Sequence, residues 1–552
     1  MNTPLGVENY IDAIKTYYVD KTNIISVILN EYIGKTLLIT RPRRFGKSLM
    51  LSMLDEFFNI NKDNKQYFID KKISQNKEIF INNINNHPVV HINMKNISAD
   101  NMESMKGQII KLVSSTYFKY RYITDGNKLL RFEVERFNKY LNGEYKNICD
   151  YQNSIYDLCE MINHFYDKRV ILLIDEYDRP LDSAYQNDFY DAAIKFFSEF
   201  YSSSLKANEY LLFSVVTGVL QISKDSIFSK LNNLNVASVD KESFNEYFGF
   251  NEEEVLKILQ DYQVDLDINE VRKWYGGYGF GKGEIYNPWS IFNLVENKRF
   301  DLYWVNTGSN QIVIDLIKKT DNAIPMLNNF VNNTHQSFSY NSAISYKDIT
   351  NSYESLFSFL VQSGYLIARY DGLSTNANLY LPNKEISEAF NREIINRAIN
   401  NNPIPSSDGL KKAIRDGNTN EISTALEQYI VGSFSYFDLN REKDYQMLIM
   451  GILYIFFDEY VIQSELVSKQ GRADIFMLPK NDKQPGIVIE LKYYNSINSK
   501  RRLMQYAKAA VEQIKTKKYY RKMSEFNVRR ILLYGFVFDK NNTFIELEEI
   551  NA

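Results

Sequence analysis

Two groups of residues in this 552-residue chain have types and spacing that suit chemistry on phosphates. The first is the segment RPRRFGKS, in which Gly46, Lys47 and Ser48 follow the apolar run TLLIT and precede LMLSML. A strand, a tight loop with free backbone N–H groups and a helix N-terminus together cradle an anionic phosphate. Lys47 would contact the β- and γ-phosphates of ATP, Ser48 would bind Mg²⁺, and Gly46 would let the backbone approach. The segment therefore predicts an ATP-binding loop.

This loop departs from the pattern GxxxxGK[ST] at its first position, where Arg41 replaces glycine. A short motif of this kind also arises by chance, as a basic surface turn. The strand before it and the helix after it favour phosphate binding, because a surface turn gives no reason for GKS to begin a helix. The loop also contains three arginines, Arg41, Arg43 and Arg44, which either stabilise phosphate charge or simply lie around the site. Arg43 is counted among the predicted ATP-binding residues.

The segment VILLIDEYD supplies the acids that such a loop needs. An apolar strand that ends in adjacent acids holds Mg²⁺ and positions water in P-loop enzymes, although solvated acids can also simply cap a strand. Asp175 would bind the metal through its water shell, and Glu176 would be the general base for the attacking water. Thr217, after a later apolar run, is predicted to sense the γ-phosphate. Because Asp175 lies so far beyond Lys47, we expect an insertion between about residues 95 and 160.

The second group consists of Asp474, Glu490 and Lys492. Glu490 and Lys492 are two residues apart in the strand-like run IVIELKYY, so side-chain alternation puts both on one face. Asp474, on an adjoining strand, can lie beside them. Two carboxylates and a lysine on adjacent strands can bind Mg²⁺ or Mn²⁺ and lower the pKa of its water. The spacing is loose by itself, but on two strands it predicts a metal-dependent phosphodiesterase centre.

Other residues near this group favour the same chemistry. Glu442 lies one turn before Tyr445 on an amphipathic helix and could reach the metal, and Gln513 is a weaker candidate for contact with substrate or metal shell. Nine basic residues and one acid lie between Lys500 and Lys522. This stretch either contacts nucleic-acid phosphates or forms a solvated helical face.

The elements that must position the first group alternate between strand and helix, as a parallel α/β sheet requires. Their apolar runs predict strands at 36–40, 88–94, 169–174 and 210–216, with a helix at 48–58. Such continuous apolar strands are typical of parallel sheets that helices cover on both faces. We therefore expect a P-loop NTPase domain with an AAA/ASCE-type parallel sheet over residues 1–240.

The middle region, residues 241–400, gives a weaker pattern. It contains the aromatic, Gly-rich segment WYGGYGFGKGEIYNPWS, for which core packing is favoured over a lid or an interface. A helix followed by two strands between residues 353 and 386 fits either a winged-helix subdomain or a plain helical lid. The Pro- and Ser-containing stretch 401–409 predicts a linker.

Residues 410–552 have an order of their own. An amphipathic helix at about 441–457 is followed by strand-like segments at 460–468, 472–478 and 487–493. A helix at about 501–518 and a strand at 528–538 complete an αβββαβ order, which is typical of a restriction-endonuclease-like domain. The whole chain is thus expected to be a multidomain α/β protein.

Composition limits the alternatives. The chain has 44% hydrophobic and 24% charged residues and no apolar run long enough to span a bilayer, which predicts a cytoplasmic protein without a membrane partner. Its two cysteines exclude a disulfide framework, and its four scattered histidines favour carboxylates as ligands for any metal. The net charge of −3 gives no general attraction to nucleic acid, so a local basic surface must supply it.

The ordered motifs resemble a largely uncharacterised family that joins an AAA-ATPase-like domain to a C-terminal PD-(D/E)XK nuclease-superfamily domain. The resemblance covers nearly the whole chain through YYVDKT, RPRRFGKSLMLSML, VILLIDEYDRP, TGVLQISKDSIFSKLNNL, WYGGY…YNPWS, YLPNKEI and GRADIF…IVIELK. It implies ATP hydrolysis through Lys47, Ser48, Asp175 and Glu176, and phosphodiester cleavage through Asp474, Glu490 and Lys492. Two positions depart from the family, since Gln221 stands where an arginine is common and Tyr445–Gln446 where an aromatic–His pair is common.

Two functional hypotheses follow. The first is an ATP-binding and ATP-hydrolysing domain that controls a Mg²⁺-dependent nuclease acting on DNA. The second is a signalling or scaffold ATPase whose nuclease-like domain only binds nucleic acid or protein. Buried like charges at Asp474 and Glu490 argue against pure binding, because a binding module has no need of them. A homo-oligomer is compatible with either hypothesis.

Overall fold

The computed structural model of the chain forms two compact units, Met1–Ile395 and Asn396–Ala552. The structure describes residues 2–222, 227, 231–239, 244–279, 284–305, 311–320, 323, 327, 336–340, 342, 344–370, 376–390, 407–433, 442–453, 456, 459–468, 471–481, 484–494, 500–518, 520–524, 528–539 and 543–551.

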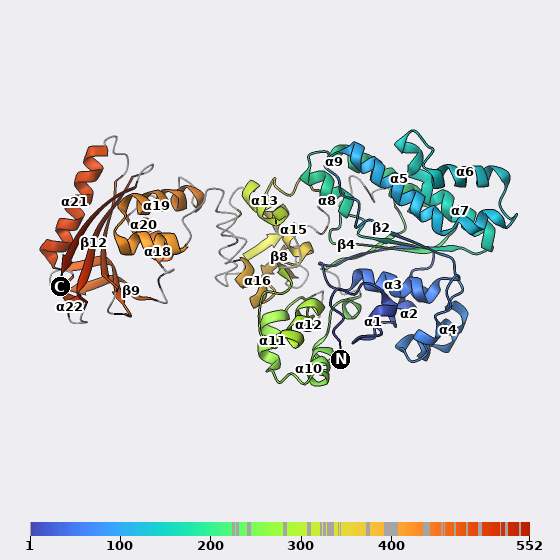
Figure 1. Cartoon of the computed structure of the whole chain (residues 1–552), viewed down its shortest axis with the longest axis horizontal. Coiled ribbons are helices and arrows are strands. Elements are labelled where there is room, and N and C mark those ends of the chain that lie inside the picture. Colours follow the sequence, from blue (N-terminus) through green and yellow to red (C-terminus); the bar gives the residue numbers. More distant parts are fainter. Residues whose placement is uncertain are drawn as a thin grey trace. The chain divides into compact units, whose positions relative to one another are not determined.

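The first unit is built on a five-stranded sheet in the order β2-β3-β4-β1-β5 (Figure 1). Its strands are β1 (Thr36–Thr40), β2 (Val89–Asn93), β3 (Val170–Asp175), β4 (Leu211–Gly218) and β5 (Leu234–Ala237). Every pairing is parallel. All residues of β1, β3 and β4 are buried, which explains their unbroken apolar character. The expected parallel α/β sheet is confirmed, and β5 is an addition.

Helices cover both faces of this sheet, with α1–α4 on one side and α5–α9 on the other (Figure 1). The bounds are α1 (Tyr10–Ala13), α2 (Ile24–Glu31), α3 (Lys47–Phe58), α4 (Lys77–Asn83), α5 (Met102–Lys119), α6 (Arg131–Asn142), α7 (Ser154–Tyr166), α8 (Arg179–Gln186) and α9 (Tyr190–Leu205). Helices α5, α6 and α7 occupy the interval in which the sequence implies an insertion.

The rest of the first unit combines helices with a small sheet. The helices are α10 (Glu252–Asp261), α11 (Ile268–Tyr275), α12 (Pro288–Asn297), α13 (Gln311–Lys319), α15 (Tyr353–Ser363) and α16 (Lys384–Ala389). The antiparallel sheet has the order β6-β8-β7, with β6 (Gln336–Ser339), β7 (Ile367–Tyr370) and β8 (Asn376–Tyr380). Helix α15 is followed by the β7–β8 hairpin, which is the helix-then-strands order expected from the sequence. A winged-helix subdomain here stays a prediction.

The second unit has a mixed sheet in the order β13-β12-β11-β10-β9. Its elements are α18 (Ser407–Asp416), α19 (Thr419–Ser433), α20 (Glu442–Leu453), β9 (Tyr460–Ser468), β10 (Gly471–Pro479), β11 (Gly486–Tyr493), α21 (Lys500–Lys517), α22 (Arg521–Ser524), β12 (Arg530–Phe538) and β13 (Thr543–Asn551). The expected αβββαβ order is present, and β13 extends it. Helix α21 covers one face and α18–α20 the other (Figure 1).

Residues 401–406 of the expected linker lie outside the described residues, and 407–409 begin α18. Within the part of the chain that is described, no helix is long and apolar enough to cross a membrane.

Candidate functional site

The loop between β1 and α3 has the geometry of a phosphate cradle. Gly46 has φ +89° and is the N-cap of α3, so the loop needs a residue that tolerates left-handed backbone. A β-carbon there would meet nothing within 4 Å, so glycine is required by conformation and not by space. Lys47 is the first helical residue, and its Nζ donates to the carbonyl oxygens of Arg41 and Pro42, both at 2.8 Å. The predicted lysine therefore lies over the loop at the start of the helix.

The three loop arginines have different environments. Arg41 is fully buried, and its Nη1 donates to Thr40 O at 2.9 Å and to Ala237 O at 2.8 Å. Its guanidinium thus joins β1 to β5, and these bonds give it a role in the sheet. Arg43 and Arg44 are exposed and line a cavity beside Lys47.

The acidic end of β3 faces this loop across β4. Strand β4 lies between β1 and β3, so Thr217 at its end is next to Asp175. Thr217 Oγ1 donates to Asp175 Oδ1 at 2.6 Å, and Asn93 Nδ2 donates to Asp175 Oδ2 at 3.1 Å. Asp175 and Thr217 are buried, and the residues that line the cavity include neither of them. Direct contact between Thr217 and a γ-phosphate stays a prediction.

Glu176 lines the cavity and has a left-handed backbone, with φ +53°. Such a conformation is uncommon for a non-glycine residue and here turns the chain at the strand end. Burial raises the pKa of Glu176, and Asp175 raises it further while Lys47 opposes the shift. Burial lowers the pKa of Lys47 to about 8, against the attraction of Asp178, Asp175 and Glu176. A carboxylate with a raised pKa near a cation suits the predicted general base.

Asp178 is a further acid at this site that the sequence did not predict. Its buried Oδ2 accepts the backbone N–H groups of Val219 and Leu220, each at 2.8 Å. Burial raises the pKa of Asp178, and these two bonds and Lys47 oppose the shift. The same residue lines the cavity and fixes the loop that leaves β4. Its position as the last acid in DEYD was the feature of the sequence that could have indicated it.

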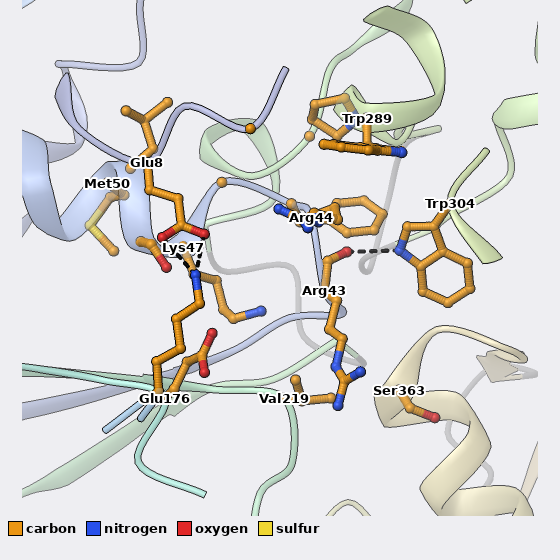
Figure 2. Close-up of a pocket in the computed structure, with 18 of the residues that line it drawn as sticks. Glu8, Arg43, Arg44, Lys47, Met50, Glu176, Val219, Trp289, Trp304 and Ser363 are labelled. Atoms are coloured by element: carbon orange, nitrogen blue, oxygen red, sulfur yellow. Dashed lines mark hydrogen bonds and ion pairs between the residues drawn. The ribbon is translucent and has the colours of Figure 1, made fainter. Parts of the chain in front are cut away.

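The cavity itself has a volume of about 770 Å³, which lies in the range of ligand pockets. Lys47 and Glu176 lie at one side of it, and Trp289 and Trp304 approach it from the middle region (Figure 2). Ser48 also lines it. A nucleotide bound at the loop would therefore contact both the sheet domain and the middle region of the same unit.

In the second unit, alternation along β11 separates two faces as expected. Ile487, Ile489 and Leu491 belong to the core that includes α20 residues, whereas Val488 packs with α21 residues. Glu490 and Lys492 share the parity of Val488 and so lie on the α21 side. The register that pairs Ile475 with Ile489 brings Asp474 of β10 next to Glu490. The structure therefore brings together the three predicted residues.

The centre of this group is Glu490, whose side chain is 2% exposed. Its Oε1 is 3.0 Å from Lys492 Nζ and also accepts a hydrogen bond from Gln513 Nε2. Its Oε2 is buried without a hydrogen-bond partner among the described residues. Burial, reinforced by Asp474, raises the pKa of Glu490 to about 7 despite the pull of Lys492. A buried carboxylate with an unpaired oxygen beside a second carboxylate is a suitable donor for a divalent cation.

The flanking residues complete the group. Asp474 Oδ2 accepts the backbone N–H of Leu491 at 2.7 Å, and its carbonyl accepts a hydrogen bond from Gln446 Nε2 at 3.1 Å. Glu442 Oε1 is 3.7 Å from Lys492 Nζ, so it reaches the group through the lysine. Gln446 and Gln513 thus hold the two carboxylate strands from α20 and α21. Gln446 occupies a position at which the family often has histidine, and this position was the feature of the sequence that could have pointed to Gln446.

The donor set fits a hard divalent ion in part. Asp474 and Glu490 would hold Mg²⁺ or Mn²⁺ with main-chain oxygens or water, and Lys492 would orient the attacking water. Within the described ranges, no group of three or more His, Cys, Asp or Glu side chains could hold a metal ion. Asp474 and Glu490 are the two carboxylates that the described part of this unit offers directly to a metal. The predicted ligand role of Glu442 stays untested.

The basic stretch is partly engaged within the unit. Lys515 forms ion pairs with Glu512 and Glu548, both at 2.9 Å. Arg501, Arg502 and Lys508 are exposed on α21, the helix that also supplies Gln513 to Glu490. Exposed cations on the same helix as Gln513 are therefore accessible to phosphates.

Comparison with known proteins agrees with this geometry. Residues 4–228 match a family described as a predicted AAA-ATPase, and residues 440–548 match the PD-(D/E)XK nuclease superfamily. The chain thus joins an AAA-ATPase-like domain to a PD-(D/E)XK nuclease-superfamily domain, which confirms the resemblance of the motifs. It is also 26% identical over 412 residues to a protein of Azotobacter chroococcum mcd 1 described as an uncharacterized protein in the vnfD 5′ region. That match covers 73% of this chain and 71% of the relative.

Proposed function

We propose that the protein binds and hydrolyses ATP in its first unit and uses this cycle to control a Mg²⁺-dependent nuclease in its second unit, with DNA as substrate. The observation that carries the nuclease half is Glu490. It is a buried carboxylate with one unpaired oxygen, set beside Asp474 and Lys492. Burying such a group costs several kcal/mol unless a cation or a donor compensates it, and catalysis gives a reason to keep it.

The proposed ATPase chemistry assigns each residue a separate task. The ammonium of Lys47 now donates to the carbonyl oxygens of Arg41 and Pro42. When ATP binds, Lys47 would donate to phosphate oxygens in place of these carbonyls. Ser48 and Asp175 would hold Mg²⁺, which neutralises developing phosphate charge when it is bound. Glu176 would accept a proton from the attacking water. Arg43 would stabilise charge on the outer phosphates.

A second candidate function is a signalling or scaffold ATPase whose nuclease-like domain only binds nucleic acid or protein. One observation favours it. Lys492 is ion-paired with both Glu490 and Glu442, so part of the negative charge of the group is balanced within the chain without a metal. A binding domain could keep such a network for its structure alone.

Cleavage of single- and double-stranded DNA by the full-length protein tests the two functions, with Mg²⁺ or Mn²⁺ and with or without ATP. Lys47→Ala and Lys492→Ala would be run beside wild type, with Lys412→Ala as an exposed lysine control. We expect Lys492→Ala to lose cleavage about 100-fold or more and to keep ATP binding. Lys47→Ala should lose ATP binding and change the ATP dependence of cleavage. Cleavage that persists in Lys492→Ala would contradict the assigned centre, and ATPase activity without any cleavage would favour the scaffold function.

A further inference from the structure

The ATP-binding loop is surrounded by aromatic residues from segments more than 200 positions away. Trp304 Nε1 donates to Arg43 O at 2.9 Å, as Figure 2 shows. The guanidinium carbon of Arg44 lies 4.5 Å from the ring centroid of Trp289. Each exposed loop arginine is therefore in contact with one tryptophan, the first through its main chain and the second through its side chain.

The neighbouring loop residues are enclosed in the same way. The ring of Phe45 packs edge-on against Tyr278, with 5.0 Å between centroids. A β-carbon added at Gly364 would lie 2.7 Å from Pro42 Cβ, so that glycine lets α15 end directly against the loop. Segments from three parts of the middle region thus fit around residues 42–45. The aromatic, Gly-rich segment of the middle region has a packing role, as expected, and it packs against the loop between β1 and α3.

One buried carboxylate holds both tryptophan-bearing segments. Glu385 is 0% exposed and is the second residue of α16. Its Oε1 accepts the backbone N–H of Trp304 at 2.6 Å, and its Oε2 accepts the hydroxyl of Ser290 at 2.8 Å. Ser290 directly follows Trp289 in α12, so each carboxylate oxygen fixes one of the two segments.

Helix α16 is itself anchored to the Gly-rich segment. Asn383 caps α16 by accepting the N–H of Ile386 at 3.1 Å, and its Nδ2 donates to Gly276 O at 2.8 Å. Gly277 has φ +83°, and a β-carbon there would lie 1.9 Å from Pro382 O. Glu385 therefore projects from a position that the surrounding backbone determines.

We propose that Glu385 is a positioning residue for the nucleotide site, which sets the shape of the phosphate loop by holding Trp304 and Trp289 against Arg43 and Arg44. The proposal rests on the proposed ATP-binding function for its effect on affinity. The carbonyl and the following N–H of a planar trans peptide point in opposite directions. The bond from Trp304 to Arg43 O thus also fixes the direction of the Arg44 N–H, one of the donors available to a phosphate.

The test compares Glu385→Ala and Glu385→Gln with wild type in the full-length protein. Amide hydrogen exchange of residues 43–47 without nucleotide measures the loop directly. We expect exchange in Glu385→Ala to rise at least about tenfold, because two donors lose their acceptor and the loop contacts loosen. Glu385→Gln should stay within about threefold of wild type, since its amide oxygen still accepts from Trp304 N. Glu388→Gln, one turn later on α16, is the matched control and should match wild type.

Affinity for Mg²⁺ and ATP, followed through tryptophan fluorescence, is the second readout. All three tryptophans of the chain, Trp274, Trp289 and Trp304, lie in the first unit. The dissociation constant should rise at least about tenfold in Glu385→Ala and should recover in Glu385→Gln. If Glu385→Ala does not fold, Trp304→Phe removes the donor to Arg43 O together with part of the ring, and it should raise loop exchange with the Glu385 bonds intact.

The outcomes separate the two ideas. Absence of ATP binding in wild type would contradict the proposed ATPase, while loop exchange would still decide the role of Glu385. Unchanged loop exchange in Glu385→Ala, or in Trp304→Phe when the first variant does not fold, would overturn the positioning role. ATP binding lost in Lys47→Ala and unchanged in Glu385→Ala would support the ATPase and reject the link from Glu385 to affinity.

Discussion

Arg41 and Ala237 join two strands through a side chain, since Arg41 Nη1 donates to Ala237 O at 2.8 Å. Arg41 occupies the position at which the phosphate-loop pattern has glycine. Its guanidinium also lies 5.5 Å from the ring centroid of Phe248. Arg41, which replaces the glycine of the pattern, therefore links the end of β1 to β5, and Gly46 and Lys47 remain the residues predicted to contact phosphate.

Arg41→Gly restores the usual pattern, yet we expect it to destabilise the first unit by about 2–4 kcal/mol. The buried carbonyls of Thr40 and Ala237 lose a charged donor, and a cavity remains. Urea unfolding followed by tryptophan fluorescence measures this effect. Arg43→Ala is the contrasting variant, because Arg43 is exposed and should affect ATP affinity more than stability. Equal stability of Arg41→Gly and wild type would contradict the structural role of Arg41.

Asp178→Ala should destabilise the first unit by about 2–4 kcal/mol, because the N–H groups of Val219 and Leu220 lose their shared acceptor. Asp178→Asn should cost less, since its Oδ1 can still accept one of these bonds. The same urea experiment compares the two variants. If Asn and Ala cost the same, the charge facing Lys47 matters more than the two hydrogen bonds.

The sequence was sufficient for the elements that have strong local signals. Continuous apolar runs predicted β1–β4 of the parallel sheet, and period-two alternation correctly put Glu490 and Lys492 on one face. The strand β5 was missed because Leu234–Ala237 is short and half-buried. Its place beside β1 depends on pairing across about 200 residues, which local patterns do not encode.

The contacts around the phosphate loop were harder to predict for the same reason. Trp304 and Glu385 look like ordinary core and helix residues in the sequence, and no spacing links them to Arg43. In the sequence, Asp178 resembles a solvated acid. In the structure it is buried and accepts the backbone N–H groups of Val219 and Leu220. Residue types indicated which side chains could do chemistry, but long-range packing decides which residues position them.

Gly277→Ala tests the close approach between the Gly-rich segment and Pro382. A β-carbon at Gly277 would lie 1.9 Å from Pro382 O, and the residue has φ +83°. Gly34→Ala is the matched control, because Gly34 has φ +74° and open space around its β-carbon. Backbone strain should cost each variant about 1–2 kcal/mol, and the clash should add several more at Gly277. Equal unfolding midpoints for the two variants would show that Pro382 moves away without cost.

Gln513→Ala tests the support of the candidate nuclease centre. Gln513 donates to Glu490 Oε1, so its loss should let the carboxylate move and reduce cleavage about 10- to 100-fold, the usual range for residues that orient a ligand. Gln505→Ala, exposed on the same helix, should leave cleavage unchanged. Mn²⁺ affinity of the full-length protein gives a second readout. A loss of cleavage that is equal in both variants would indicate an effect on α21 as a whole.

The carboxyl of Glu385 should make the stability of the first unit depend on pH near neutrality. Burial raises its pKa from 4.5 to about 7, and the bonds from Trp304 and Ser290 oppose the shift. Tyr275, Tyr278 and Tyr303 interact electrostatically with it, and burial raises the pKa of each hydroxyl, so all three stay neutral in this range. The charge of Lys384, the preceding residue, lies over the ring of Trp274.

The sign follows from the direction of this shift. A carboxyl whose pKa is higher in the folded state binds its proton more tightly there, so its contribution to stability is present below pH 4.5 and is lost as the pH rises through 7. Between pH 5 and pH 8, wild type should therefore lose about 2–3 kcal/mol of unfolding free energy relative to Glu385→Gln, which cannot ionise. Urea unfolding followed by tryptophan fluorescence at both pH values measures this difference, with Glu388→Gln as control. Parallel pH profiles for wild type and Glu385→Gln would mean that Glu385 stays charged throughout, because its two hydrogen bonds outweigh the cost of burial.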